Sequence, residues 1–247
     1  MIIRLGCLVS LLLTLGPSTF GQKSTEVRDE LWLAYFNQTR LTNRSGLWTD
    51  LQMRFTDHFT HAKSQGSIRL GYTYYISDAV RLTAGYANVT TFGLQGDPDI
   101  PEHRPWQQIQ WYEKKKRFNT MQYFRLEERF RRKVVAGELT DDYTFNWRFR
   151  YTMTFMLPLK GREITPKVPF LFFSNEILIN AGKQIVNNYF DQNRFALGIG
   201  YPFTPRLNLQ LAYLDVFQQL PAGNQYVNIN AIRIIVLQTL DLRKTSH

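Results

Sequence analysis

The 247-residue sequence contains a single cysteine, Cys7. This residue lies in the apolar segment LGCLVSLLLTLG (5–16), which follows the basic lead MIIR and precedes the small residues Thr19 and Gly21. A basic lead, an apolar stretch and small residues before a cleavage site are typical of an export signal. We therefore expect a signal peptide at 1–21 and a mature domain at 22–247. The expected mature domain has no cysteine, which excludes a disulfide framework and thiolate chemistry.

Long apolar runs are also missing after the expected signal. No stretch of eighteen apolar residues follows it, so the sequence excludes a membrane-spanning helix. A transmembrane β-barrel is compatible with this absence, because its strands are segments of about ten residues that alternate lipid-facing and lumen-facing side chains. An aromatic content of 15% agrees with such a barrel.

Helical periodicity is absent as well, whereas segments with a period of two recur from end to end. The segments are LWLAYF (31–36), LWTDLQMRF (47–55), IRLGYTYYI (68–76), VRLTAGYA (80–87), EHRPWQQIQWY (102–112), NTMQYFRLEERF (119–130), DYTFNWRFRYTMTFML (142–157), PFLFFSNEILI (169–179), RFALGIGY (194–201), RLNLQLAY (206–213) and YVNINAIRIIVLQTL (226–240). We predict an all-β protein, a single antiparallel transmembrane β-barrel of 10–12 strands. An antiparallel barrel with both ends on one side needs an even count, so 31–36 is either an accessory segment or the partner of an unseen twelfth strand.

The connections between these segments differ in length. Short turns are expected at 77–78 and 202–205, and long polar connections at 90–101, 133–142 and 218–225. Outer-membrane barrels combine tight periplasmic turns with longer outside loops. The pattern therefore favours that class.

Lysine is scarce in the predicted strands, and arginine takes its place. The ten lysines fall in or beside connections or near the termini, at positions 23, 63, 114, 115, 116, 133, 160, 167, 183 and 244. Arginine suits enclosed networks with many hydrogen bonds better than lysine does. Glycine is useful where a wall is crowded, and the polar face also carries Gly71, Gly85, Gly198 and Gly200. We therefore place the arginines inside the barrel and the aromatic side chains outside.

Five stretches carry a family resemblance: EHRPWQQ (102–108), RLEERF (125–130), RFRYTM (148–153), the Asn175–Glu176 pair and NRFALGIGY (193–201). Together they resemble the domain of unknown function 2490 family, over most of the expected mature chain. The resemblance implies an exported outer-membrane barrel. It supplies no catalytic residue and no activity.

The densest polar positions define a predicted charge network in the lumen. Its candidate members are Arg54, Arg69, Glu102, His103, Arg104, Arg125, Glu127, Arg129, Arg148, Arg150 and Arg194. The alternative interpretation makes Glu102 and His103 an acid–base pair, with arginines that hold an anionic substrate. Structural ion networks gather the same residue types, so we name no catalytic residue.

Two other groups of residues suggest binding. His58 and His61 have a spacing that binds a metal on a helix, but they fall in an expected loop without a third ligand, so we predict no metal and no cofactor. The basic stretch EKKKR (113–117) and the net charge of +10 suit anionic lipid head groups. We expect outer-membrane lipids and the barrel-assembly machinery as partners, and no nucleic acid. The oligomeric state is open.

The sequence thus predicts a non-enzymatic protein of the cell outer membrane, either a narrow anion-favouring pore or a structural component. Two alternatives stay open. One is an outer-membrane enzyme that modifies lipids through Glu102 and His103. The other is a soluble periplasmic barrel that is apolar inside and binds a hydrophobic ligand.

Overall fold

The structure, a computed structural model, describes residues 23–94 and 96–243. The predicted signal peptide lies outside these residues. The described chain forms eleven strands: β1 (Ser24–Arg40), β2 (Ser45–Thr56), β3 (Ala62–Tyr75), β4 (Val80–Thr91), β5 (Ile100–Lys115), β6 (Phe118–Val135), β7 (Glu138–Pro158), β8 (Phe170–Ala181), β9 (Phe190–Thr204), β10 (Leu207–Gln219) and β11 (Gln225–Asp241). In this part of the chain, no helix has the length and apolar character to cross a membrane.

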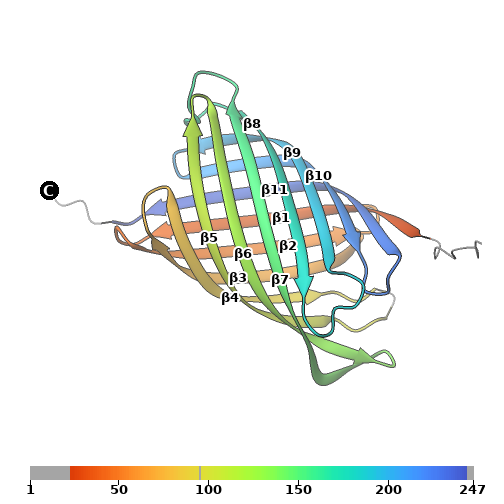
Figure 1. Cartoon of the computed structure of the whole chain (residues 1–247). Helices are drawn as coiled ribbons and strands as arrows, with labels where there is room; N and C mark the ends of the chain where they lie inside the picture. The colour runs from red at the N-terminus through yellow and green to blue at the C-terminus, as the bar shows by residue number, and fades with distance from the viewer. Residues whose placement is uncertain (1–22, 95, 244–247) are drawn as a thin grey trace, which may run out of the picture.

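The strands close into one barrel in which each pairs with its neighbours in sequence, and β1 pairs with β11 (Figure 1). Ten of the pairings are antiparallel, whereas β1 and β11 run parallel from Ser24↔Gln225 to Arg40↔Asp241. The all-β barrel prediction is confirmed. The purely antiparallel prediction is wrong at this seam, because eleven strands close only if one pair is parallel. The segment 31–36 is neither accessory nor the sign of a twelfth strand, since it lies within β1.

One long connection in the prediction is a β-hairpin in the structure. β6 continues to Val135 and β7 begins at Glu138, so only Ala136 and Gly137 form the turn, with φ of 53° and 84°. Two consecutive positive φ values are those of a type I′ turn, which matches the twist of a hairpin. The prediction of a polar loop at 133–142 is therefore wrong. The hairpin projects beyond the neighbouring strands (Figure 1).

Connections of different length gather at the two ends of the barrel. At the end where β1 and β11 finish, the connections are 41–44, 76–79, 116–117, 159–169 and 205–206; at the other end they are 57–61, 92–99, 136–137, 182–189 and 220–224. The short turns are mostly at the first end, as expected, and 159–169 is the exception there. We call the second end the cavity end, because residues of its connections line a cavity.

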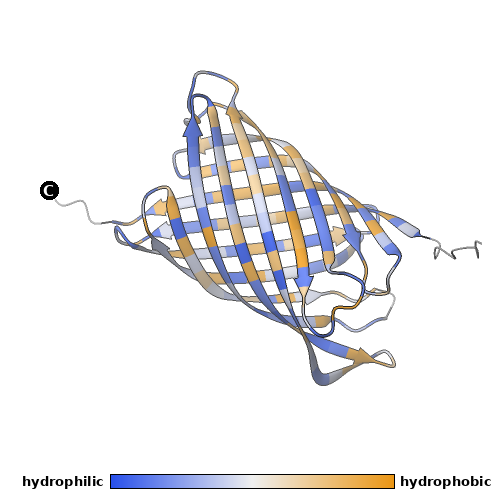
Figure 2. Cartoon of the chain, in the orientation of Figure 1, coloured by the Kyte–Doolittle hydropathy of each residue, from blue (hydrophilic) through white to orange (hydrophobic). Residues whose placement is uncertain are grey.

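The outer surface of the barrel is apolar and aromatic. Along β7, Tyr143 and Tyr151 are exposed, whereas Arg148 and Arg150 between them are buried. The hydropathy of successive residues also alternates along much of the wall (Figure 2). The predicted interior position of the arginines is confirmed. The prediction that the aromatic side chains lie outside is wrong for some of them, because Trp32, Trp48, Trp106, Phe170 and Phe172 are buried.

The interior has two unlike halves. Most of the buried arginines and carboxylates lie on β2 to β7, and Glu30, Glu176, Asp191 and Arg194 lie on β1, β8 and β9. The half formed by β8 to β11 and β1 also contains an apolar cluster. That cluster includes Trp32, Phe170, Leu214, Val216 and Val227. The sequence analysis did not anticipate it, because apolar residues occupy both faces of β11 and hide the alternation there.

Glycines make room for the aromatic rings that fill the barrel. A Cβ added to Gly71 would lie 2.9 Å from Cζ2 of Trp106, which is fully buried. A Cβ added to Gly200 would overlap the ring of Phe170. Close contacts of this kind require a residue without a side chain. A ring also lies close to Gly198, whose added Cβ would lie 2.7 Å from Cζ of Phe172. At Gly85 the close contact is with backbone, 2.0 Å from the carbonyl oxygen of Leu70.

Candidate functional site

A cavity of about 1320 Å³ occupies the cavity end of the barrel. Its wall includes residues from the connections 57–61, 92–99, 182–189 and 220–224, which all lie at that end. Eleven of the lining side chains are Arg or Lys, and five are Asp or Glu. The cavity is therefore strongly basic.

Glu127 lies at the centre of the charge network below this cavity. Its side chain is 0% exposed, and its carboxylate lies 3.3 Å from the guanidinium of Arg150, 3.7 Å from those of Arg104 and Arg125, and 3.8 Å from that of Arg69. Within the described residues neither of its oxygens accepts a hydrogen bond. Glu127 thus acts as a shared counterion for four arginines from four strands.

Glu102 forms a second, tighter centre. Arg129 donates two hydrogen bonds to its carboxylate, at 2.6 Å and 2.9 Å, and Arg104 donates a third. A bidentate contact between Arg and a carboxylate fixes the geometry of both side chains. The carboxylate of Glu102 is therefore fully engaged in structural ion pairs.

Two further pairs join β7, β8 and β9. Arg194 lies 2.7 Å from Glu176, which also accepts a hydrogen bond of 2.6 Å from the hydroxyl of Tyr123. Arg148 lies 2.7 Å from Asp191. These contacts extend the network beyond β7 to β8 and β9.

Within the part of the chain that the structure describes, Arg54 lacks a carboxylate partner, unlike the other arginines of the predicted network. Its guanidinium lies over the ring of Trp32, at 3.6 Å from the centroid, and it lines the cavity. Among the described residues no carboxylate lies within 4.0 Å of Arg54, nor of Arg131, which also lines the cavity. A cation–π contact stabilises Arg54 without neutralising it. Both arginines therefore present positive charge to the cavity without a directly paired carboxylate in this part of the chain.

Ten of the eleven predicted network residues face the interior: Arg54, Arg69, Glu102, Arg104, Arg125, Glu127, Arg129, Arg148, Arg150 and Arg194. His103 is the exception. It lies on the opposite face of β5 from Glu102, where its Nδ1 is hydrogen-bonded to the hydroxyl of Tyr86 and its ring lies near that of Tyr143. Consecutive residues of a strand face opposite sides, so Glu102 and His103 do not form an acid–base pair.

The predicted network omitted several interior residues, among them Asp50, the partner of Arg69, Glu176, the partner of Arg194, and also Asp191 and Trp32. Asp191, the partner of Arg148, stands three positions before the predicted start of its strand at Arg194. Trp32 supports both Arg54 and Arg194 from within β1, a strand whose place in the barrel the sequence left open. The alternation around Trp32 could have identified it as an interior residue of a strand. No local pattern in the sequence indicates that Asp191 faces the interior.

The fold and its interior define a class: an eleven-stranded closed β-barrel with a buried arginine–carboxylate network and a basic cavity at one end. No curated protein and no solved structure is significantly similar to this chain. A family model described as protein of unknown function, DUF2490, matches residues 29–227. The chain belongs to this family, as the resemblance in the sequence predicted.

Proposed function

We propose that this chain is an integral outer-membrane β-barrel, closed along its axis, that binds small multiply charged anions in the cavity at its one open end. The observation that carries the membrane part is the inverted distribution of side chains. Charged residues such as Glu127 and Arg69 are buried inside, and large apolar residues such as Ile68, Leu70 and Tyr72 are more than half exposed outside.

The apolar exterior supports a lipid environment. Monomeric soluble proteins rarely expose contiguous apolar patches beyond a few hundred Å², yet here exposed large hydrophobic residues occur on all eleven strands. A tilted strand needs about 9–11 residues to cross a bilayer, and the shortest strands of this barrel have 12. Each strand is therefore long enough to span a membrane.

The alternatives from the sequence find less support. A soluble barrel for a hydrophobic ligand requires an apolar interior and a polar exterior, and this barrel has a charged half inside and rings outside. A lipid-modifying enzyme that uses Glu102 and His103 would need both residues on one side of the wall. Neither arrangement fits the described residues.

Side-chain packing supports a closed barrel rather than a pore. Between the cavity and the opposite end, the interior contains fully buried Trp106 and Phe170 together with buried Trp48 and Phe172. Trp48 and Trp106 also pack edge to face, with ring centroids 6.2 Å apart. We therefore favour an anion-binding or structural component over the anion-favouring pore.

Fractionation tests the membrane part of the proposal. We expect the protein to stay in the outer-membrane pellet after osmotic shock and after alkaline carbonate, and to dissolve only in detergent. We also expect unboiled protein to migrate faster than boiled protein in gels, as closed barrels do. Release by osmotic shock without detergent would contradict the proposal.

Calorimetric titration of the detergent-solubilised protein with tripolyphosphate tests the anion site. Arg54→Gln and Arg131→Gln should each weaken binding by about tenfold, since a charge-assisted hydrogen bond contributes about 1.5–3 kcal/mol. The matched control is Arg206→Gln, in an exposed turn at the opposite end. Equal affinity in all four proteins would exclude the cavity as the binding site.

A further inference from the structure

The connection between β2 and β3 folds tightly over the cavity end. Asp57, His58 and Phe59 are three consecutive residues in the left-handed region, with φ of 55°, 53° and 71°. The amide of His61 donates a hydrogen bond of 3.1 Å to the carbonyl oxygen of Asp57. Phe59 also forms a parallel bridge with Glu30 of β1. The loop is therefore held to the barrel at its middle and closed at its base.

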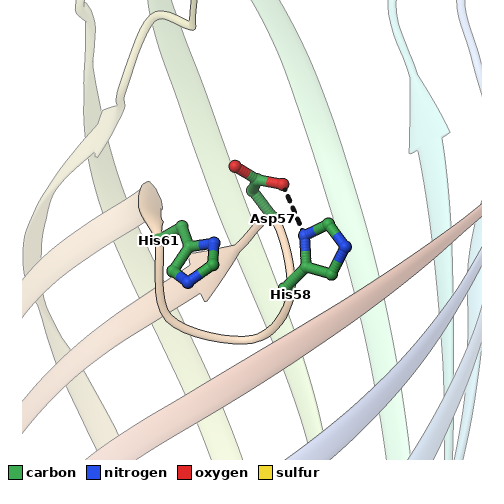
Figure 3. A group of neighbouring side chains, drawn as sticks. All are labelled: Asp57, His58 and His61. Carbon is green, nitrogen blue, oxygen red and sulfur yellow. Dashed lines mark hydrogen bonds and ion pairs between the residues drawn. The ribbon is translucent and has the colours of Figure 1, made fainter.

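This backbone brings three metal-binding side chains together. One donor atom each from Asp57, His58 and His61 lies within 4.8 Å of the other two. Nδ1 of His58 is 2.9 Å from Oδ1 of Asp57, and the two imidazole rings have centroids 5.6 Å apart (Figure 3). The sequence analysis placed the two histidines in a loop without a third ligand, and the structure supplies Asp57 as that third donor.

The donor set is that of a transition-metal site. Two imidazoles and one carboxylate suit Zn²⁺ and related ions, with ligand bonds of about 2.0–2.2 Å. Two donors on one ion are at most about 4.4 Å apart at these bond lengths, so binding needs only small rotations of side chains. All three side chains are exposed, and such rotations are unhindered. Three protein ligands leave at least one coordination position for water or another ligand.

We propose that Asp57, His58 and His61 form a binding site for a zinc-class divalent ion at the mouth of the cavity. Asp57 and His58 themselves line the cavity, so the ion would lie at its entrance. Ca²⁺ and Mg²⁺ prefer sites made of oxygen ligands, and we expect neither to bind. The proposal rests on the loop alone and does not depend on the membrane location or on anion binding.

Titration of the full chain in detergent, after removal of metals with a chelator, tests the site with ZnCl₂. Wild-type protein should bind one Zn²⁺ per chain. His58→Ala and His61→Ala should each weaken binding by at least about tenfold, because even the loss of an outer-shell partner costs 10–100-fold in metal affinity. Asp57→Asn should weaken binding in the same direction, since the amide is a poorer ligand than the carboxylate.

The matched control is His103→Ala, which removes a histidine from the outer face of β5 and should leave Zn²⁺ binding unchanged. The shift in gel mobility on boiling checks that every variant has folded, and the exposure of the loop makes loss of folding unexpected. Failure of the wild-type protein to bind Zn²⁺ would overturn the proposal. Wild-type affinity in both His58→Ala and His61→Ala would overturn it as well.

Discussion

Replacement of Glu127 by glutamine tests whether the buried network holds the barrel together. The substitution keeps the shape of the side chain and removes the one negative charge that Arg69, Arg104, Arg125 and Arg150 share. Arg125 would then lose its ion pair with Glu127. Arg69, Arg104 and Arg150 would keep their contacts with Asp50, Glu102 and Glu176, in that order. We expect a strong loss of stability.

The magnitude follows from the distances. At an effective dielectric constant of about 20, unit charges separated by the 3.3 Å between Glu127 and Arg150 attract by roughly 5 kcal/mol. The cost of taking the carboxylate out of water, several kcal/mol, offsets part of this attraction. Removal of one partner from a buried ion pair typically destabilises a protein by about 3–5 kcal/mol, and we expect a loss in that range for Glu127→Gln.

The assay is urea unfolding in lipid vesicles, followed by tryptophan fluorescence and by the gel shift on boiling. Glu128→Gln is the matched control, because Glu128 is the next residue of β6 and accepts only a 3.3 Å hydrogen bond from Gln107 at the surface. We expect its loss to be about 0–1 kcal/mol. If Glu127→Gln unfolds at the same urea concentration as this control, the electrostatic reasoning is refuted.

A second substitution tests whether the instability of Glu127→Gln comes from the lost attraction to the carboxylate or from repulsion among the arginines that remain. Arg125→Met removes one of the four cations around Glu127 and replaces it with an aliphatic side chain. In the Glu127→Gln background it should restore part of the lost stability, because fewer positive charges then repel one another. A double variant that is less stable than Glu127→Gln by the full cost of Arg125→Met alone would show that repulsion is not the cause.

Three further predictions concern the packing, the seam and the lumen. Gly200→Ala should destabilise the barrel by about 1–3 kcal/mol, because the new methyl group would overlap the ring of Phe170. Adding Phe170→Leu should restore stability, and the urea midpoints of the single and double variants measure both effects. If the double variant is no more stable than Gly200→Ala, the ring of Phe170 is not the cause. Leu33 and Ile234 are partners in the parallel register, so cysteines at these two positions should form a disulfide on oxidation. Cysteines at Leu33 and Ile232 should form one much less readily. The reverse preference would contradict the register. Planar bilayers that contain the wild-type protein should show no steady conductance, and sustained current would contradict a closed lumen.

The sequence predicted the wall of the barrel well and its seam poorly. Alternation along β7, from Tyr143 to Leu157, was enough to place Arg148 and Arg150 inside, because each side chain in a strand faces one of only two environments. The parallel seam could not be read in the same way. Nothing local in β1 or β11 records which strand lies beside it, and an expectation of even strand number excluded the arrangement that occurs.

The candidate site was also predicted only where it depends on alternation along a strand. Ten of the residues that the polar face of the strands suggested point into the barrel, and their role as a site stays a prediction. The period of two alone already separates Glu102 from His103. The proximity of Asp57 to His58 and His61 depends on three left-handed residues in succession. Such a backbone is uncommon for residues other than glycine, and a sequence pattern does not reveal it.

The parallel pairing of β1 and β11 determines at which end of the barrel the first and last strands begin and finish. Because β1 and β11 point the same way, Ser24 and Asp241 lie at opposite ends of the barrel (Figure 1). In a bilayer Ser24 and Asp241 would therefore face different compartments, and antibodies on one side of the membrane should reach an epitope next to only one of these two residues. An odd number of strands also cannot be made of antiparallel hairpins alone. The barrel therefore closes only when β1 pairs with β11, a strand that runs in the same direction.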